Sequence, residues 1–300
     1  MPLPFYIVGP TASGKSGVGL APAERIGGEI VNADAFQVYR GLDIVTAKPS
    51  AADRVRVPHH LFDVLDPSEN CDAQRYRDMA LPVLAEIAAR GGTPIVVGGS
   101  GLYVKALTHG LAELPKGDEA MRARFSHLTL GEKITWLLQL DPEAWTNVNL
   151  RNPRYVERAL EVCLLTGRPQ SELRRTFADV KLDARGVCLE WDRAQLYERI
   201  NKRVMAMIAA GLVDEVRGLG PLSDTAEKAI GIREMRQVLA GEMTLAAATD
   251  AIQQATRRYA KRQVTWFRRE RWLQTICLEP ETTADSAAQA ILDLFPDLKP

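Results

Sequence analysis

The sequence predicts an α/β fold, in which a parallel sheet flanked by helices is interrupted by an inserted, mostly helical domain. Three observations predict it. Strand-like segments at residues 5–8, 29–34 and 93–97 alternate with segments of helical periodicity, as in parallel sheets. The first strand leads into a glycine-rich loop and a helix, the arrangement of P-loop NTPases. From residue 114 to about residue 190 the strands give way to helical segments.

The loop after the first strand, residues 9–16, reads GPTASGKS and fills the pattern G-x-x-x-x-G-K-[ST] at every fixed position. Such a loop points backbone N–H groups into one anion-sized hollow at the positive end of the following helix, while its lysine adds charge and its hydroxyl can bind Mg²⁺. We expect a phosphate site with Ser16 as the metal ligand, and ATP is the usual occupant of such a loop. The predicted binding residues are Gly9, Pro10, Thr11, Ala12, Ser13, Gly14, Lys15 and Ser16.

Two further loops follow the next strands of the predicted sheet. Asp34 comes at the end of the second strand, and ligands of parallel sheets bind at this edge, so it is a candidate metal ligand or general base. A turn or helix cap is the alternative role. The third strand closes on Gly98-Gly99-Ser100-Gly101 before a helix at 102–107, which makes a second, weaker candidate for an anion site.

Composition excludes several classes of protein. The 300 residues carry 38 basic and 38 acidic side chains, so the net charge does not indicate a nucleic-acid binder. The four cysteines lie far apart, which favours reduced thiols in a cytoplasmic protein and disfavours a zinc site. His59 and His60 are adjacent and would point to opposite faces of an extended segment, so they seldom bind one ion. No apolar run approaches the length of a membrane span.

The C-terminal third carries a strong basic pattern. After a predicted strand at 187–191 and a helix at 194–210, residues 244–272 fit a long helix with an apolar stripe from Leu245 to Trp266. Aromatic residues between the cations favour RNA binding, because rings and guanidinium planes stack on bases, and a merely solvated face is the alternative. The cations of this face are Arg257, Arg258, Lys261, Arg262, Arg268 and Arg269, and the aromatic residues are Trp266, Phe267 and Trp272.

Eight motifs together resemble the tRNA dimethylallyltransferase family, also called tRNA isopentenyltransferases or IPP transferases. They are GPTASGKS at 9–16, NADAFQVYRGL at 32–42, TAKP at 46–49, PHHL at 58–61, GGSGLY at 98–103, RALEV at 158–162, AIGIR at 229–233 and YAKRQVTWFR at 259–268. Members transfer a dimethylallyl group from its diphosphate to N6 of the adenine immediately 3′ of the anticodon. The resemblance therefore implies that the loop binds a diphosphate donor rather than a nucleotide.

The resemblance also implies roles for single residues. Asp34 would be the catalytic base, while Thr11 and Arg233 would act on the diphosphate, with Mg²⁺ as cofactor. The implied domains are 1–114 for the first part of the core, 115–186 for the insertion that grips the tRNA, and 187–300 for the rest of the core with the basic helices. The expected partner is a tRNA anticodon stem-loop bound by a monomer. Expected tRNA contacts are Asp34, Ala35, Phe36, Gln37, Ser100, Arg122, Arg154, Tyr155, Val156, Glu157, Arg158, Lys228, Ala229, Ile230, Gly231, Ile232, Arg233, Arg258 and Arg262.

The sequence departs from the family pattern at several positions and leaves alternatives open. Ala35 and Phe36 stand where serine and methionine are common, Val45 replaces a usual glycine, Ser100 a threonine and Ile232 a tyrosine. One alternative is an adenylate dimethylallyltransferase that accepts free AMP, ADP or ATP. The insertion and the basic helix favour tRNA, since a free nucleotide needs neither. A P-loop kinase and a non-catalytic tRNA-binding module are alternatives from other classes.

Overall fold

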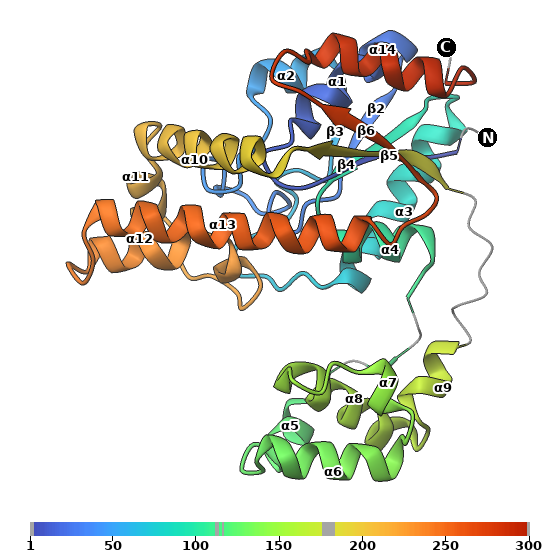
Figure 1. The fold of residues 1–300 in the computed structure, drawn as a ribbon, viewed down its shortest axis with the longest axis vertical. Helices are drawn as coiled ribbons and strands as arrows, with labels where there is room; N and C mark the ends of the chain where they lie inside the picture. Colours follow the sequence, from blue (N-terminus) through green and yellow to red (C-terminus); the bar gives the residue numbers. More distant parts are fainter. Residues whose placement is uncertain (1–2, 112–113, 116, 176–183, 299–300) are drawn as a thin grey trace. The chain divides into compact units, whose positions relative to one another are not determined.

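The computed structural model describes residues 3–111, 114–115, 117–175 and 184–298, and its contacts divide the chain into two compact units (Figure 1). The core unit comprises residues 1–108 and 183–300, and the helical unit comprises residues 109–182. The insertion expected at 115–186 thus starts earlier and ends earlier. Its last two expected residues already belong to a strand of the core, which begins at Arg185.

The core unit contains a six-stranded parallel sheet with flanking helices, so the predicted fold class is confirmed (Figure 1). The strand order is β3-β2-β4-β1-β5-β6. The strands are β1 (Phe5–Val8), β2 (Glu29–Asn32), β3 (His59–His60), β4 (Pro94–Gly98), β5 (Arg185–Trp191) and β6 (Leu273–Leu278). The edge strands β3 and β6 were not predicted. Two residues are too few to show a period, and β6 directly follows the long basic helix.

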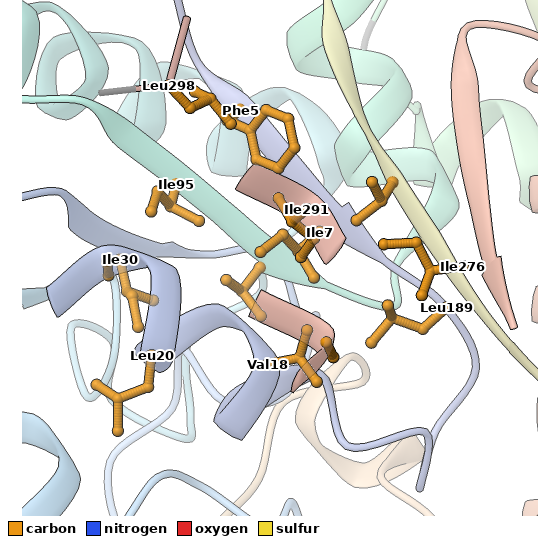
Figure 2. Close-up of a cluster of buried hydrophobic side chains, with 14 of the residues drawn as sticks. Phe5, Ile7, Val18, Leu20, Ile30, Ile95, Leu189, Ile276, Ile291 and Leu298 are labelled. Carbon is orange, nitrogen blue, oxygen red and sulfur yellow. The ribbon is translucent and has the colours of Figure 1, made fainter. Parts of the chain in front are cut away.

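Helices cover both faces of the sheet. Helices α1 (Lys15–Ile26) and α14 (Ala284–Leu294) pack together on the face that carries Phe5 and Ile7, where they enclose a cluster of buried apolar side chains (Figure 2). Ile7 and Ile291 are fully buried there, and such burial stabilises the fold by roughly 1.5–3 kcal/mol per side chain. The other helices of this unit are α2 (Ala51–Arg56), α3 (Ala73–Ala89), α4 (Gly101–Thr108), α10 (Arg193–Ala209), α11 (Leu212–Arg217), η1 (Ala226–Lys228), α12 (Ile232–Leu239) and α13 (Leu245–Phe267).

The helical unit has a core of its own. Its described helices are α5 (Glu119–Phe125), α6 (Leu130–Leu140), α7 (Ala144–Asn147), α8 (Pro153–Thr166) and α9 (Gln170–Arg175). Phe125, Leu137 and Leu160 are buried between them. Helix α8 is one of the helical segments predicted after residue 114: Asn152 caps its first turn, and Gly167 ends it with a φ of 66° that favours glycine.

The long basic helix α13 is shorter and rotated relative to the prediction. It ends at Phe267 because the chain turns into β6, so Trp272 is not helical. The buried stripe runs through Ala248, Ile252, Ala260 and Phe267, while Leu245 and Trp266 at the ends of the expected stripe are exposed. The expectation that three aromatic rings are free to stack on bases is therefore wrong for Phe267, which is 2% exposed. Trp272 instead packs edge-on against Tyr6, with ring centroids 5.3 Å apart.

Candidate active site

Two polar segments predicted from the sequence meet at the carboxyl edge of the sheet. The phosphate loop, residues 9–16, follows β1, and Asp34 follows β2; both strands pair with β4 between them. A cleft of about 470 Å³ lies at this edge. It brings Asp34 and Gln37 together with five loop residues, which are Thr11, Ala12, Gly14, Lys15 and Ser16. The sequence thus placed both ends of the site correctly.

The phosphate loop has the geometry of an anion site. Gly14 begins α1 in a left-handed conformation with φ of 89°, no side chain of the described residues caps this helix, and its first residues line the cleft. Lys15 curls back to donate from Nζ to the carbonyl of Pro10 at 2.7 Å. Burial lowers the pKa of Lys15 to about 8, a shift that the charge of Asp34 opposes and that of Arg203 reinforces.

Arginine side chains from α10 complete the loop, and sequence reasoning missed them. Arg203 donates to the Thr11 hydroxyl at 2.6 Å, and burial lowers the pKa of its guanidinium, with Asp34 opposing. Its Nε is buried without a hydrogen-bond partner among the described residues. Such an atom is costly to leave unsatisfied, which suits a site that receives an anion. Arg203 therefore offers a desolvated positive charge beside Thr11.

The far side of the loop is fixed by a second arginine and a tryptophan. Arg199 donates from Nε to the Ala12 carbonyl at 2.9 Å and lies over the Trp191 ring, 4.1 Å from its centroid. Trp191 in turn donates from Nε1 to the Ser13 carbonyl at 3.0 Å. These two bonds occupy the carbonyl groups of Ala12 and Ser13. The one available signal was that Arg199 and Arg203 stand one turn apart on a predicted helix.

Asp34 is held in a defined orientation at the end of β2. Its Oδ1 accepts the N–H of Phe36 at 2.9 Å, and its own N–H donates to Asn32 Oδ1 at the same distance. Asn32 is fully buried and donates from Nδ2 to the Leu61 carbonyl at 3.0 Å. The carboxylate therefore forms the turn that was considered as its alternative role, and it also lines the cleft.

The turn at residues 98–101 packs against this segment. A Cβ on Gly98 would lie 2.2 Å from the Ala33 carbonyl oxygen, so only glycine allows the two backbones to approach. Ser100 donates its N–H to the same carbonyl at 3.2 Å. Gly98 lines the cleft and Ser100 does not. The turn at residues 98–101, which was the weaker candidate for an anion site, packs closely against Ala33.

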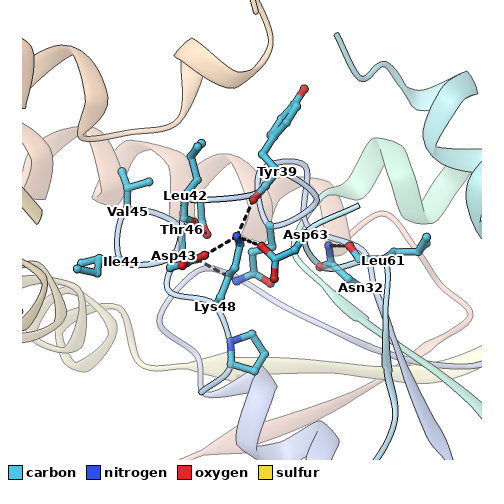
Figure 3. A network of polar contacts seen from close by, with 12 residues as sticks. Asn32, Tyr39, Leu42, Asp43, Ile44, Val45, Thr46, Lys48, Leu61 and Asp63 are labelled. Atoms are coloured by element: carbon cyan, nitrogen blue, oxygen red, sulfur yellow. Dashed lines mark hydrogen bonds and ion pairs between the residues drawn. The ribbon is translucent and has the colours of Figure 1, made fainter. Parts of the chain in front are cut away.

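A polar network fixes the loop at residues 42–48, which forms the rim of the cleft (Figure 3). The side chain of Lys48 is 2% exposed and donates to the Tyr39 carbonyl and to Asp43, each at 2.6 Å, and to Asp63. Gln37 donates to the carbonyl groups of Thr46 and Ala47 at 2.9 and 3.1 Å. The rim is therefore held by buried hydrogen bonds rather than by apolar packing alone.

Glu215 on α11 supports the same rim. Its carboxylate accepts the N–H groups of Asp43, Ile44 and Val45 at 2.7–2.9 Å. Val45 is buried, and its backbone is not in the left-handed region, so the conformation does not require the glycine expected there. This explains how the chain tolerates one of its departures from the family pattern.

Replacing Lys48 with methionine should lower the free energy of unfolding by about 1–3 kcal/mol, because Asp63 and Asp43 lose the cation they share. Burial alone would raise the pKa of Asp63, but the hydrogen bonds from Lys48 and Arg54 outweigh it, so the pKa lies below its usual value. The stabilisation is thus present at neutral pH and disappears as acid protonates Asp63. Because the Asp63 pKa lies below its usual value, the loss occurs only in strong acid, and urea unfolding at pH 7 and pH 3 should give a smaller difference at pH 3. As a control, Lys202→Met removes an exposed lysine, and its free energy of unfolding should stay close to that of the wild type at both pH values.

A family model described as IPP transferase matches residues 37–270. The chain belongs to the IPP transferase family. It is 47% identical over 275 residues to tRNA dimethylallyltransferase 1 of Citrifermentans bemidjiense, which covers 89% of this chain and 90% of the relative. The crystal structure of the full-length tRNA isopentenylpyrophosphate transferase from Bacillus halodurans matches with a TM-score of 0.73 and 35% identity, over 99% of this chain and 97% of the other.

A structure of a eukaryotic dimethylallyltransferase acting on tRNA shares the fold, with a TM-score of 0.86 over 100% of this chain and 81% of the other, at 24% identity. Membership of the IPP transferase family makes this chain a prenyltransferase. Within the described residues, no helix combines the length and the apolar character that a membrane crossing requires.

Other predicted site residues of this IPP transferase do not line the cleft. The Arg233 side chain is 78% exposed and pairs with Glu234 at 2.9 Å. Lys228 is exposed on the same surface, whereas Ala229, Gly231 and Ile232 are buried. Arg199 and Arg203, rather than Arg233, are the arginines that the structure places beside the phosphate loop. Ile232 is a core residue, which accounts for an apolar side chain where a tyrosine is usual.

The predicted contacts in the helical unit divide into surface and core residues. Arg154 and Tyr155 are exposed. Arg122 and Arg158 both pair with Glu161, a carboxylate that is 1% exposed, at 3.3 and 2.5 Å. Glu157 pairs with Lys133. Val156 is fully buried in the core of the helical unit, so its side chain does not face solvent.

Proposed function

We propose that the chain transfers a dimethylallyl group from dimethylallyl diphosphate to N6 of the adenosine immediately 3′ of the anticodon in tRNA. The observation that carries the proposal is one cleft with an anion cradle, the buried Arg203 and the Asp34 carboxylate. The relative from Citrifermentans bemidjiense and the Bacillus halodurans enzyme carry names of this activity. A monomer located in the cytoplasm stays a prediction from the sequence.

The phosphate loop would bind the leaving group. During transfer the C1–O bond of the donor breaks, and diphosphate leaves with the bonding electron pair. The loop N–H groups, Lys15 and Arg203 are positioned to stabilise that developing negative charge in a site where Arg203 is already desolvated. The Thr11 hydroxyl, held by Arg203, lies on the same side of the cleft.

Asp34 would act on the acceptor. The N6 amino group forms a bond to C1 and must lose one proton, and its lone pair is weakly nucleophilic because it is delocalised into the ring. A carboxylate that accepts this proton contributes about 10²–10⁴-fold. The hydrogen bond from the Phe36 N–H to Asp34 Oδ1 orients the carboxylate in the cleft. The reaction balances, because its products are the N6-substituted adenosine, diphosphate and a proton.

A Mg²⁺ ion fits the chemistry of the site. The described residues contain no group of three or more acidic, histidine or cysteine side chains that could hold a metal by themselves. The Ser16 hydroxyl lies in the cleft at the start of α1, and Mg²⁺ commonly combines few protein ligands with phosphate oxygens and water. We therefore infer that Ser16 would hold the ion together with the diphosphate, where it would neutralise phosphate charge.

Mass spectrometry tests the proposed reaction against its rivals. The protein is incubated with Mg²⁺, dimethylallyl diphosphate and a mixture of an anticodon stem-loop, AMP and ATP. Addition of one dimethylallyl group to the stem-loop adenosine is expected. Prenylated AMP as the main product would identify an adenylate dimethylallyltransferase, and phosphorylation that consumes ATP would identify a kinase. Binding of the stem-loop without any product would leave only the RNA-binding module.

Charge reversal of Arg258 and Arg262 should weaken stem-loop binding and reduce its dependence on salt. Both side chains are exposed on α13, and Arg262 lies over the Tyr259 ring, 5.6 Å from its centroid. Each lost phosphate contact should change the slope of log K against log salt by roughly 0.7–0.9. Fluorescence anisotropy between low and moderate salt measures it. The matched control reverses Arg25 and Arg56 on α1 and α2, and an equal slope in both variants would mean that the α13 face is only solvated.

A further inference from the structure

Gln263 carries a buried amide in the last turns of α13. It is 5% exposed, and a glutamine buried so fully is expected to use its hydrogen-bonding groups. Oε1 accepts the backbone N–H of Thr11 at 2.8 Å, and Nε2 donates to the carbonyl of Gly99 at 2.8 Å. One side chain thus joins the phosphate loop to the turn at residues 98–101.

The shape of that turn is matched to the amide. A Cβ on Gly99 would lie 2.3 Å from Gln263 Nε2, a distance that only displacement of the amide could relieve. Gly99 is not in the left-handed region, so its own backbone does not require glycine. The absence of a side chain there serves the approach of Gln263.

Thr11 is consequently held at two points. Gln263 binds its N–H, and Arg203 binds its hydroxyl at 2.6 Å. One turn earlier on α13 lies the half-buried Tyr259, whose hydroxyl pKa is raised by burial and raised further by the negative charge of Asp34. Helix α13 therefore connects to both sides of the cleft, while Arg258 and Arg262 on the same helix face solvent.

The two bonds require a side chain that accepts and donates at once. Glutamate would lose the donor and would bring a negative charge into a cleft suited to anions. Methionine has a similar length and offers neither strong partner, so the Thr11 N–H and the Gly99 carbonyl would both be left buried and unpaired. Glutamine is therefore the side chain that joins these two loops without adding charge.

We propose that Gln263 is a positioning residue for dimethylallyl transfer. It fixes Thr11 and the 98–101 turn in one arrangement, and so sets the distance between the donor diphosphate on the loop and the Asp34 carboxylate. The inference rests on the proposed function, because it takes the ligand of the loop to be the diphosphate of the donor.

Gln263→Met and the control Gln253→Met test the proposal. Gln253 is on the same helix, half-buried, and its amide makes one long bond to the Asn201 carbonyl at 3.4 Å. Misplacement of reacting groups by about 1 Å costs on the order of 10²-fold, so kcat of Gln263→Met should fall by about that factor. Its affinity for inorganic diphosphate with Mg²⁺, measured by calorimetry, should also fall, while stem-loop affinity stays within about twofold of the wild type. Wild-type kcat and diphosphate affinity in Gln263→Met would overturn the proposal.

A double-mutant cycle provides a second route in case Gln263→Met does not fold. Gly99→Ala should displace the amide and lower kcat and diphosphate affinity in the same way. Combined with Gln263→Ala, the alanine at position 99 meets only the Gly9 carbonyl at 3.2 Å, which a small shift relieves, so the two losses should be less than additive. Additive losses would overturn the proposal. If the wild type binds diphosphate but prenylates no stem-loop, the proposed function fails, and the diphosphate affinities still test Gln263.

Discussion

Replacing Asp34 with asparagine should reduce the rate of dimethylallyl transfer by about 10²–10⁴-fold, because the variant has no group to accept the N6 proton. Asparagine retains an Oδ1 that can accept the Phe36 N–H, so the turn after β2 should persist. Affinities for the stem-loop and for inorganic diphosphate should therefore remain near those of the wild type. Single-turnover measurements with saturating tRNA separate the chemical step from binding.

Asp66→Asn is a matched control for this prediction. Asp66 also accepts the N–H of the residue two positions later, that of Ser68 at 3.0 Å, but it is exposed and lies outside the cleft. The control should transfer dimethylallyl at the wild-type rate. Wild-type turnover by Asp34→Asn would remove the carboxylate from the mechanism. Loss of tRNA binding in Asp34→Asn, with an unchanged rate at saturation, would assign Asp34 to recognition instead.

Local sequence was sufficient for the phosphate loop and Asp34. The residues at 9–16 could be recognised from local sequence, since the glycines, the lysine and the following helix are contiguous in the chain. Asp34 could be placed because a residue that ends a parallel strand must lie at the same edge as the loop after β1. The prediction therefore depended only on chain order and on the rule that such strands are parallel, and the register of β1, β2 and β4 agrees with it.

Arg203 and Gln263 could not be predicted in the same way. Each contacts Thr11 across a large separation in sequence, and helical periodicity does not reveal which side of α10 or α13 meets the loop. In the sequence, Arg203 looks like an ordinary surface residue of a polar helix. Gln263 falls on the apolar stripe from Leu245 to Trp266, which indicates burial but does not identify its partner. Arg233 belongs to a family motif, so the resemblance assigned it a role at the phosphates, although its side chain is exposed. The desolvation of Arg203 and its position beside Thr11 favour Arg203 for that role.

Arg203→Gln should lower the transfer rate by about 10²–10³-fold and weaken the binding of inorganic diphosphate, since the cleft loses a desolvated charge aimed at the leaving group. The transfer rate and diphosphate affinity of Arg203→Lys should lie between those of the wild type and Arg203→Gln. Lysine keeps the charge but cannot reproduce the planar guanidinium that reaches Thr11. Isothermal calorimetry with diphosphate and single-turnover kinetics measure the two effects separately.

Two controls distinguish Arg203 from arginines in general. Arg193→Gln, on the same helix, removes a charge that lies over the Tyr197 ring and outside the cleft, and should leave both quantities unchanged. Arg233→Gln should leave diphosphate affinity unchanged, because that side chain is exposed and paired with Glu234. If Arg233→Gln weakens diphosphate binding while Arg203→Gln does not, the neutralising charge comes from Arg233 after all, and α12 must then move toward the phosphate loop when the donor binds.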